Sequence, residues 1–176
     1  MKRLGLVMLA VALCVVAARP VMAQGTLRYG VSAGLLMPTG TYNTNDKMGW
    51  VAGAGATYWL PGNVGIRGDL SYSTTSHNTG SGNTKIIGGM ASVVYALMPA
   101  SAPARLMVTG GVGYFNTKES VTSTSASKVG FGVGAAVAFK LGTGSTRLVV
   151  GSRYTSVSTA TKLNFVPITV GLTFGK

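Results

Sequence analysis

Three charged residues have types and spacing that could form a functional site: Arg67, Asp69 and Arg153. Arg67 and Asp69 are two positions apart, so in a β-strand their side chains lie on one face. Asp69 is the only acidic residue that we place inside a strand, because Asp46 and Glu119 fall in connections. If Arg153 faces the same space, the carboxylate should be ionised and should accept hydrogen bonds from the guanidinium groups in fork geometry. An ion network that fills a barrel lumen, or a charged constriction in a narrow anion-favouring pore, would use these groups.

His77 is the single histidine of the chain, and it lies between Ser76 and Asn78. A histidine base activates a serine hydroxyl only within hydrogen-bond reach and with a third group that orients it. Adjacent positions in a connection do not ensure that geometry, so we favour a solvated histidine and predict that the chain is not an enzyme. One histidine and three acids supply no recognisable metal-ligand set, and the glycine-rich stretches lack the spacing of a dinucleotide loop. We therefore predict no metal and no cofactor.

The stretch from Lys128 to Lys140 indicates which elements position these residues. Between the two lysines, odd positions are mostly bulky and apolar, whereas even positions are glycine or alanine. This alternation predicts a strand with one apolar face and one nearly bare face. A soluble sandwich also has one apolar face, turned inward, but this strand would then expose only small residues to water. A membrane-spanning barrel strand, apolar toward lipid and with Phe131 and Phe139 near its ends, fits better.

Eight segments show alternation of this kind, and each is long enough to cross a bilayer at a tilt, which needs about 9–11 residues. The predicted strands are Leu27–Met37, Gly49–Leu60, Val64–Thr75, Thr84–Leu97, Arg105–Thr117, Lys128–Lys140, Thr146–Ser158 and Leu163–Phe174. Their connections alternate between long and short, as in membrane barrels. We therefore predict an all-β fold, an eight-stranded antiparallel transmembrane up-and-down β-barrel, with the long polar connections outside the cell.

The composition supports a membrane protein. Only 10% of the 176 residues are charged, against roughly 25% in soluble domains. Beyond the N-terminal segment, no run of 18 apolar residues could form a spanning helix. Because only helices and closed barrels satisfy every backbone group in lipid, the β-barrel is the remaining solution.

The N-terminus is typical of a secretory signal peptide, with two basic residues, a short apolar segment and a cleavage site that we place after Ala23. We predict a signal peptide over residues 1–23 and an outer-membrane β-barrel domain over residues 24–176. Cys14 falls in the removed segment, so neither disulfides nor thiol chemistry would act in the mature chain.

The two faces of the predicted strands differ. Outward aromatic residues form two belts, one at each membrane interface, where amphipathic rings prefer to lie. One belt comprises Tyr29, Tyr58, Tyr95, Phe139 and Phe174, and the other comprises Trp50, Tyr72, Tyr114, Phe131 and Tyr154. The inward positions carry charges, hydroxyls and many glycines, which predict room for water: Arg28, Arg67, Asp69, Ser71, Ser73, Ser92, Thr109, Gly111, Gly113, Arg147, Arg153, Thr155, Thr169 and Thr173.

The chain is strongly basic, with a formal net charge of +12. Without the basic residues Lys2, Arg3 and Arg19, 12 basic and 3 acidic residues leave +9. These basic residues are spread singly, without a cluster or a basic helix, which argues against nucleic acid as a partner. Outer-membrane lipid and the phosphates of lipopolysaccharide are the expected partners. The candidate lipopolysaccharide contacts are Lys47, Lys85, Lys118, Lys128 and Lys162.

The signal segment, the alternating strands, the polar connections and the closing Ile168–Phe174 resemble the small outer-membrane β-barrel family (OmpA/OmpX-like). The resemblance implies an envelope structural or surface-interaction role, such as adhesion or ligand binding through the outer connections. It also implies that the barrel-insertion machinery reads the strand ending at Phe174, although Gly175 and Lys176 follow it here. Some barrels resembling this one are lipid A-modifying enzymes that use a histidine and a serine. Such an enzyme, or a narrow pore for small solutes or ions, is the alternative, and we expect a monomer.

Overall fold

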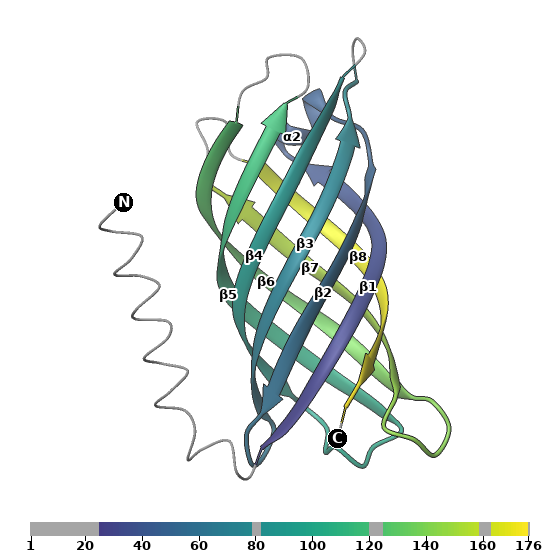
Figure 1. Ribbon diagram of the computed structural model, residues 1–176. Helices are drawn as coiled ribbons and strands as arrows, with labels where there is room; N and C mark the ends of the chain where they lie inside the picture. Colours follow the sequence, from purple (N-terminus) through teal and green to yellow (C-terminus); the bar gives the residue numbers. More distant parts are fainter. Residues whose placement is uncertain (1–24, 79–81, 120–124, 159–162, 176) are drawn as a thin grey trace, which may run out of the picture.

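The computed structural model describes residues 25–78, 82–119, 125–158 and 163–175, which form strands and one short helix (Figure 1). The strands are β1 (Thr26–Thr39), β2 (Gly49–Trp59), β3 (Val64–Ser76), β4 (Asn83–Ala96), β5 (Ala104–Glu119), β6 (Ser125–Lys140), β7 (Arg147–Val157) and β8 (Leu163–Phe174), and the helix is α2 (Thr41–Asn45). No helix in these ranges is both long and apolar enough to cross a membrane. The predicted signal peptide, residues 1–23, and Lys162 lie outside the described residues.

The strands form one closed antiparallel sheet in sequence order. Each strand pairs with the next, and β8 pairs with β1, where Tyr29 lies opposite Phe174. The predicted eight-stranded up-and-down barrel is therefore confirmed. We call the end with the connections 60–63, 97–103 and 141–146 the short-turn end, and the opposite end, which carries α2, the long-connection end (Figure 1).

Several strands extend further at the long-connection end than the sequence predicted, including β1, which ends at Thr39 and not at Met37; β5 and β6 together extend the most. β5 runs to Glu119 and β6 begins at Ser125, with Lys118 opposite Ser125. Both ends of the predicted connection at 118–127 are therefore strand. Serine and threonine in this segment suggest a connection by composition, but the two backbones continue their ladder of hydrogen bonds. A side-chain bond supports it, because Asn116 Nδ2 donates to Ser127 Oγ at 2.7 Å.

The outward face is apolar and has an aromatic belt near each end. Exposed rings near the short-turn end are Tyr29, Tyr95, Phe139 and Phe174, and those toward the other end are Trp50, Tyr114, Phe131 and Tyr154. Tyr58 and Tyr72 are half-buried, and the Trp50 and Tyr72 ring centroids are 5.5 Å apart. An apolar surface this continuous requires an apolar surrounding, as in a membrane barrel.

The lumen holds two apolar clusters that the sequence analysis did not anticipate. The long-end cluster comprises Leu36, Tyr42, Val51, Ile86, Met90, Phe115, Val157 and Phe165. The short-end cluster comprises Trp59, Val94, Ala96, Met107 and Ala138. A cavity of about 210 Å³ borders both clusters, so the lumen is partly filled and partly open. The expectation that glycines leave room for water was therefore right for only part of the interior.

Candidate functional site in the barrel lumen

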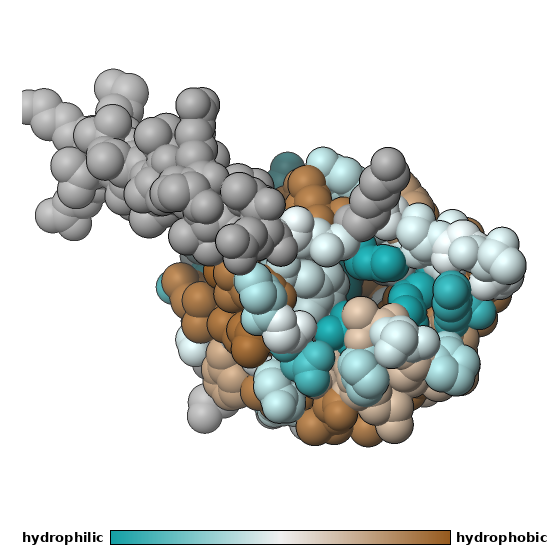
Figure 2. Space-filling view, turned by 90° about the horizontal axis from the view of Figure 1, so that it is seen from below, coloured by the Kyte–Doolittle hydropathy of each residue, from teal (hydrophilic) through white to brown (hydrophobic). Residues whose placement is uncertain are grey.

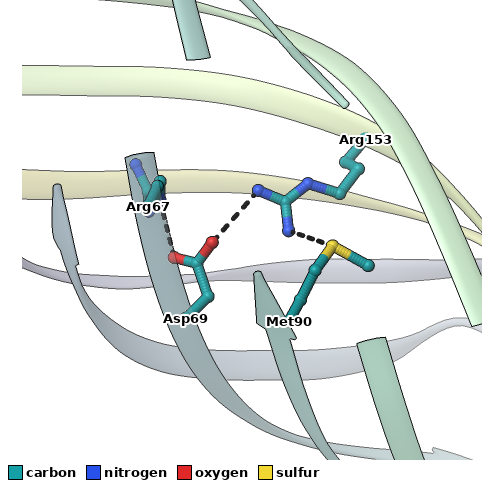
Figure 3. Close-up of polar contacts among 4 residues, drawn as sticks. All are labelled: Arg67, Asp69, Met90 and Arg153. Carbon is teal, nitrogen blue, oxygen red and sulfur yellow. Dashed lines mark hydrogen bonds and ion pairs between the residues drawn. The ribbon is translucent and has the colours of Figure 1, made fainter. Parts of the chain in front are cut away.

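Arg67, Asp69 and Arg153 meet in the lumen (Figure 3). Arg67 Nε donates to Asp69 Oδ1 at 2.7 Å, and Arg153 Nη2 donates to Asp69 Oδ2 at 3.2 Å. Each guanidinium reaches a different carboxylate oxygen, so the carboxylate bridges two cations and the expected fork geometry is not formed. Arg153 Nη1 also donates to Met90 Sδ at 3.0 Å, a weak acceptor. We call these three charged residues the ion network.

The ion network joins opposite walls of the barrel. β3 supplies Arg67 and Asp69, whereas β7 supplies Arg153, four strands further in a ring of eight. Two glycines leave the space that these side chains need. A Cβ atom on Gly55 would lie 2.6 Å from Asp69 Oδ1, and one on Gly132 would lie 3.0 Å from Arg153 Cδ. Glycine at both positions therefore allows long polar side chains to meet across the lumen.

Phe115 closes the lumen on the long-connection side of the ion network. Its ring packs on three bare backbone positions, where an added Cβ would lie 2.5 Å (Gly88), 3.0 Å (Gly113) and 3.0 Å (Gly130) from ring atoms. Phe115 also meets Phe165 edge-to-face, with centroids 6.2 Å apart. Both phenylalanines fall on the inward parity of their strands, opposite to belt residues such as Tyr114. That parity is the signal that could have identified them.

Three further arginines lie in the lumen at the short-turn end. Their guanidinium groups donate to backbone carbonyls of the short connections: Arg28 Nη1 to Ser145 (2.8 Å), Arg105 Nε to Met98 (3.0 Å), and Arg147 Nη1 and Nη2 to Ala102 and Ala100. The Arg105 guanidinium also lies 4.0 Å from the centroid of the Trp59 ring. The sequence analysis did not single out Arg105, because it stands at the start of its predicted strand. We call Arg28, Arg105 and Arg147 the arginine trio.

Asp46 lies in the first connection, as predicted, and is buried beside the long-end cluster. Asp46 is 3% exposed, and its Oδ1 accepts a hydrogen bond from Thr75 Oγ1 at 2.9 Å. Tyr42 Oη lies 2.8 Å from the same Oγ1. Because the single hydroxyl hydrogen of Thr75 goes to the carboxylate, Tyr42 must donate to Thr75. Tyr42 belongs to α2, so this chain of bonds fixes the helix over the long-connection end of the lumen.

The first and third connections of the chain, both at the long-connection end, are joined through their backbones and one side chain. Asp46 and His77 form an isolated antiparallel bridge, and Lys47 N donates to Ser76 O at 2.7 Å. Asn78 Nδ2 donates to the carbonyls of Asn43 (3.0 Å) and Thr44 (2.9 Å). The two connections therefore behave as one structural unit.

His77 makes its side-chain contact with Thr84 rather than with the neighbouring Ser76. Its Nε2 lies 3.4 Å from Thr84 Oγ1, a long hydrogen-bond distance. The bridging partner Asp46 directs Oδ1 to Thr75. A serine–histidine–acid triad needs the acid to hydrogen-bond the histidine and the histidine to hydrogen-bond the serine hydroxyl. The contacts given above for these side chains, all within the described residues, differ from that arrangement.

Four of the five candidate lysines fall within the described residues, and all four lie at the long-connection end. Lys47, Lys85, Lys118 and Lys128 are exposed. Lys85 on β4 and Lys118 on β5 are direct cross-strand partners, so two like charges stand side by side. Such a pair is unfavourable unless an anion lies near both ammonium groups.

Comparisons with known proteins agree with this architecture. The profile of the family described as "Outer membrane protein beta-barrel domain" matches residues 8–174. Neisserial surface protein A (NspA) is similar in structure, with a TM-score of 0.65 and 14% identity over 86% of this chain and 97% of that one. OprG from Pseudomonas aeruginosa gives a TM-score of 0.60 and 10% identity over 89% of this chain and 100% of that one.

A third similar structure is Ail of Yersinia pestis in complex with the heparin analogue sucrose octasulfate. Its TM-score is 0.53, with 18% identity over 85% of this chain and 97% of that one. A comparison with curated protein sequences found no match. The structural likenesses show the shared fold, and the family profile extends over nearly the whole chain. The chain therefore belongs to the outer membrane protein beta-barrel domain family.

Proposed function

We propose that this outer-membrane barrel is non-enzymatic and acts at the cell surface, where the long-connection end binds phosphorylated or sulfated sugars. The observation that carries this proposal is that the lumen is blocked at the long-connection end. The long-end cluster and the ion network occupy the path along the barrel axis, and α2 lies over them. Apolar constrictions stop ion flow by excluding water. Because a lumen blocked in this way does not favour conduction, we infer that the barrel acts through its outer surface.

The long-connection end is suited to an anionic partner. β5 and β6 have 16 residues each, more than the roughly 9–11 that cross a bilayer, so their ends project as a paired ribbon. Lys85 and Lys118 lie opposite one another near this end, and Lys128 is exposed on β6. Sugar phosphates or sulfates would relieve the repulsion of the Lys85–Lys118 pair. The lipid A part of lipopolysaccharide carries such phosphates next to the barrel wall.

A narrow pore is the second candidate, because the cavity of about 210 Å³ is lined by arginines from several strands. Opening would require the ion network and the long-end cluster to separate. Conductance measurements in planar bilayers distinguish the two functions, since a surface-binding barrel with this lumen stays closed.

Insertion and assembly follow from the outward face. Phe174 is exposed at the short-turn end of β8, and Tyr29 lies opposite it on β1. We expect the insertion machinery to read this strand, and lipid to cover the apolar wall around a single barrel.

The binding test uses the barrel in nanodiscs of zwitterionic phospholipid. Lipid A and sucrose octasulfate are the two probes, one for the cell's own membrane and one for foreign sulfated glycans. The variant Lys85→Gln/Lys118→Gln should bind both more weakly, with a smaller dependence on salt. Lys140→Gln, which removes a charge at the short-turn end, is the matched control. Equal binding by the parent and both variants would contradict the proposal, and steady conductance of the parent would favour the pore.

A further inference from the structure

The arginine trio lies on alternate strands around one side of the short-turn mouth. Arg105 is on β5, Arg147 on β7 and Arg28 on β1, with β6 and β8 between them. Small residues lie opposite two of the three arginines on one side, Ala138 opposite Arg105 and Thr173 opposite Arg147, whereas on β6 the exposed Lys140 lies opposite Arg147 and adds a further positive charge at the mouth. Long side chains from the three strands can therefore approach the same space. Seen from this end, hydrophilic residues surround a central hollow inside the hydrophobic outer wall (Figure 2).

The charges that line the cavity are strongly unbalanced. Five arginines and one carboxylate line it, so the formal charge of the described wall is +4. Asp69 is engaged by Arg67 and Arg153, which leaves the arginine trio without a carboxylate among the described contacts. The charge of Arg147 acts on both Arg28 and Arg105, and that of Arg28 acts on Arg105. Like charges held together beside a membrane-embedded wall are unfavourable unless an anion accompanies them.

The trio also keeps hydrogen-bond donors for a ligand. Each guanidinium carries five N–H donors in a planar fork. The contacts with the short connections use one on Arg28, one on Arg105 and two on Arg147. Those contacts are to carbonyls, which hold the groups in place without neutralising them. Planar forks of this kind match the oxygen spacing of phosphate groups.

We propose that the arginine trio forms a binding site for small multivalent oxyanions of the phosphate type, which enter the cavity from the short-turn mouth. Arg105 and Arg147 are buried and form the floor of the site, and the more open Arg28 forms its rim. The site lies at the opposite end of the barrel from the lysines of the proposed surface function and is independent of it. The proposed orientation places its entrance on the periplasmic side.

Trp59 provides a local reporter for the test, because its ring lies under the Arg105 guanidinium. The chain has two tryptophans, and Trp50 is exposed at the other end. Trp50→Phe barrels, folded in non-ionic detergent, are titrated with inorganic pyrophosphate at constant ionic strength while Trp59 emission is followed. We expect a saturable change in emission. Calorimetric titration of the same samples gives the affinity.

Two variants and one control make the test specific. Arg28→Gln and Arg147→Gln should each weaken pyrophosphate binding by about tenfold or more, as expected for loss of a hydrogen bond to a charged group. The change in gel mobility on boiling shows whether each variant is folded. Arg28→Gln loses only one carbonyl contact, so it provides the test if Arg147→Gln does not fold. Lys47→Gln removes one charge at the opposite, long-connection end, away from the cavity wall, and should bind as the parent does.

Two sources of the anion are distinguished by a second arm. The detergent samples contain no phospholipid, so binding there assigns the site to free phosphates. If Trp59 emission does not respond to pyrophosphate in detergent but responds to phosphatidylglycerol in nanodiscs, and this response is lost in Arg28→Gln, the phosphate of a lipid headgroup occupies the site. The proposal is overturned if the parent responds to neither pyrophosphate nor phosphatidylglycerol, or if Arg28→Gln and Lys47→Gln weaken the response equally.

Discussion

Replacing Asp69 by alanine is the most informative perturbation of the lumen. It removes the single carboxylate of the ion network and leaves Arg67 and Arg153 facing each other across the barrel. Breaking a fully buried pair costs ~3–5 kcal/mol, whereas an exposed pair contributes ~0.2–1 kcal/mol. The side chains of Asp69, Arg67 and Arg153 are 15%, 28% and 21% exposed, so the ion network is neither fully buried nor fully exposed. We therefore expect a loss of about 2 kcal/mol in the free energy of unfolding, between the two limits.

Urea titration of the barrel in lipid vesicles measures this loss. The double variant Asp69→Ala/Arg67→Ala should recover part of it, because one of the two stranded cations is then gone. Ser71→Ala is the matched control, since it removes a polar lumen side chain two residues along the same strand without removing a charge. If Asp69→Ala is as stable as the parent, the ion network does not hold the walls together and the reasoning is refuted. Higher conductance of Asp69→Ala in planar bilayers would show that the network blocks a pore.

Three further predictions test the packing and the orientation of the strands. Gly88→Ala should destabilise the barrel by about 1–3 kcal/mol, because the new Cβ would lie 2.5 Å from the Phe115 ring, whereas Gly110→Ala, 3.9 Å from its nearest neighbour, should be tolerated. Val133 is 53% exposed on the outward face, so Val133→Arg should cost ~2–4 kcal/mol in vesicles and Val133→Leu little; equal folding yields would contradict the assigned parity. Phe174→Ala should reduce the amount of folded, heat-modifiable barrel in the outer membrane without changing synthesis, and unchanged assembly would exclude Phe174 as the insertion signal.

The outward half of the barrel could be predicted because a strand has an exact period of two. In β6, one parity carries Val129, Phe131 and Val133, and all three are exposed on the outer wall. The ion network could be anticipated for a similar reason. Arg67 and Asp69 share a face by spacing, and Asp69 was the only carboxylate assigned to a strand.

The filling of the lumen could not be read from the sequence in the same way. Phe115 packs on glycines of β4, β5 and β6, and this depends on the register of three strands at once. Asp46 is buried because Thr75, far along the chain, supplies its hydrogen bond. Such contacts are set by strand register and barrel closure, which the periodicity of one strand does not encode.

The joined first and third connections have a consequence for engineering this barrel as a display scaffold. Exposed loop tips usually accept inserted peptides. Here the Asn43 and Thr44 carbonyls accept hydrogen bonds from Asn78, and the Lys47 amide donates to the Ser76 carbonyl. An insertion between Asn43 and Lys47 would move these groups apart and break their bonds to the third connection. A foreign epitope in the first connection would therefore disturb the third, and a library that varies one of them must vary both together.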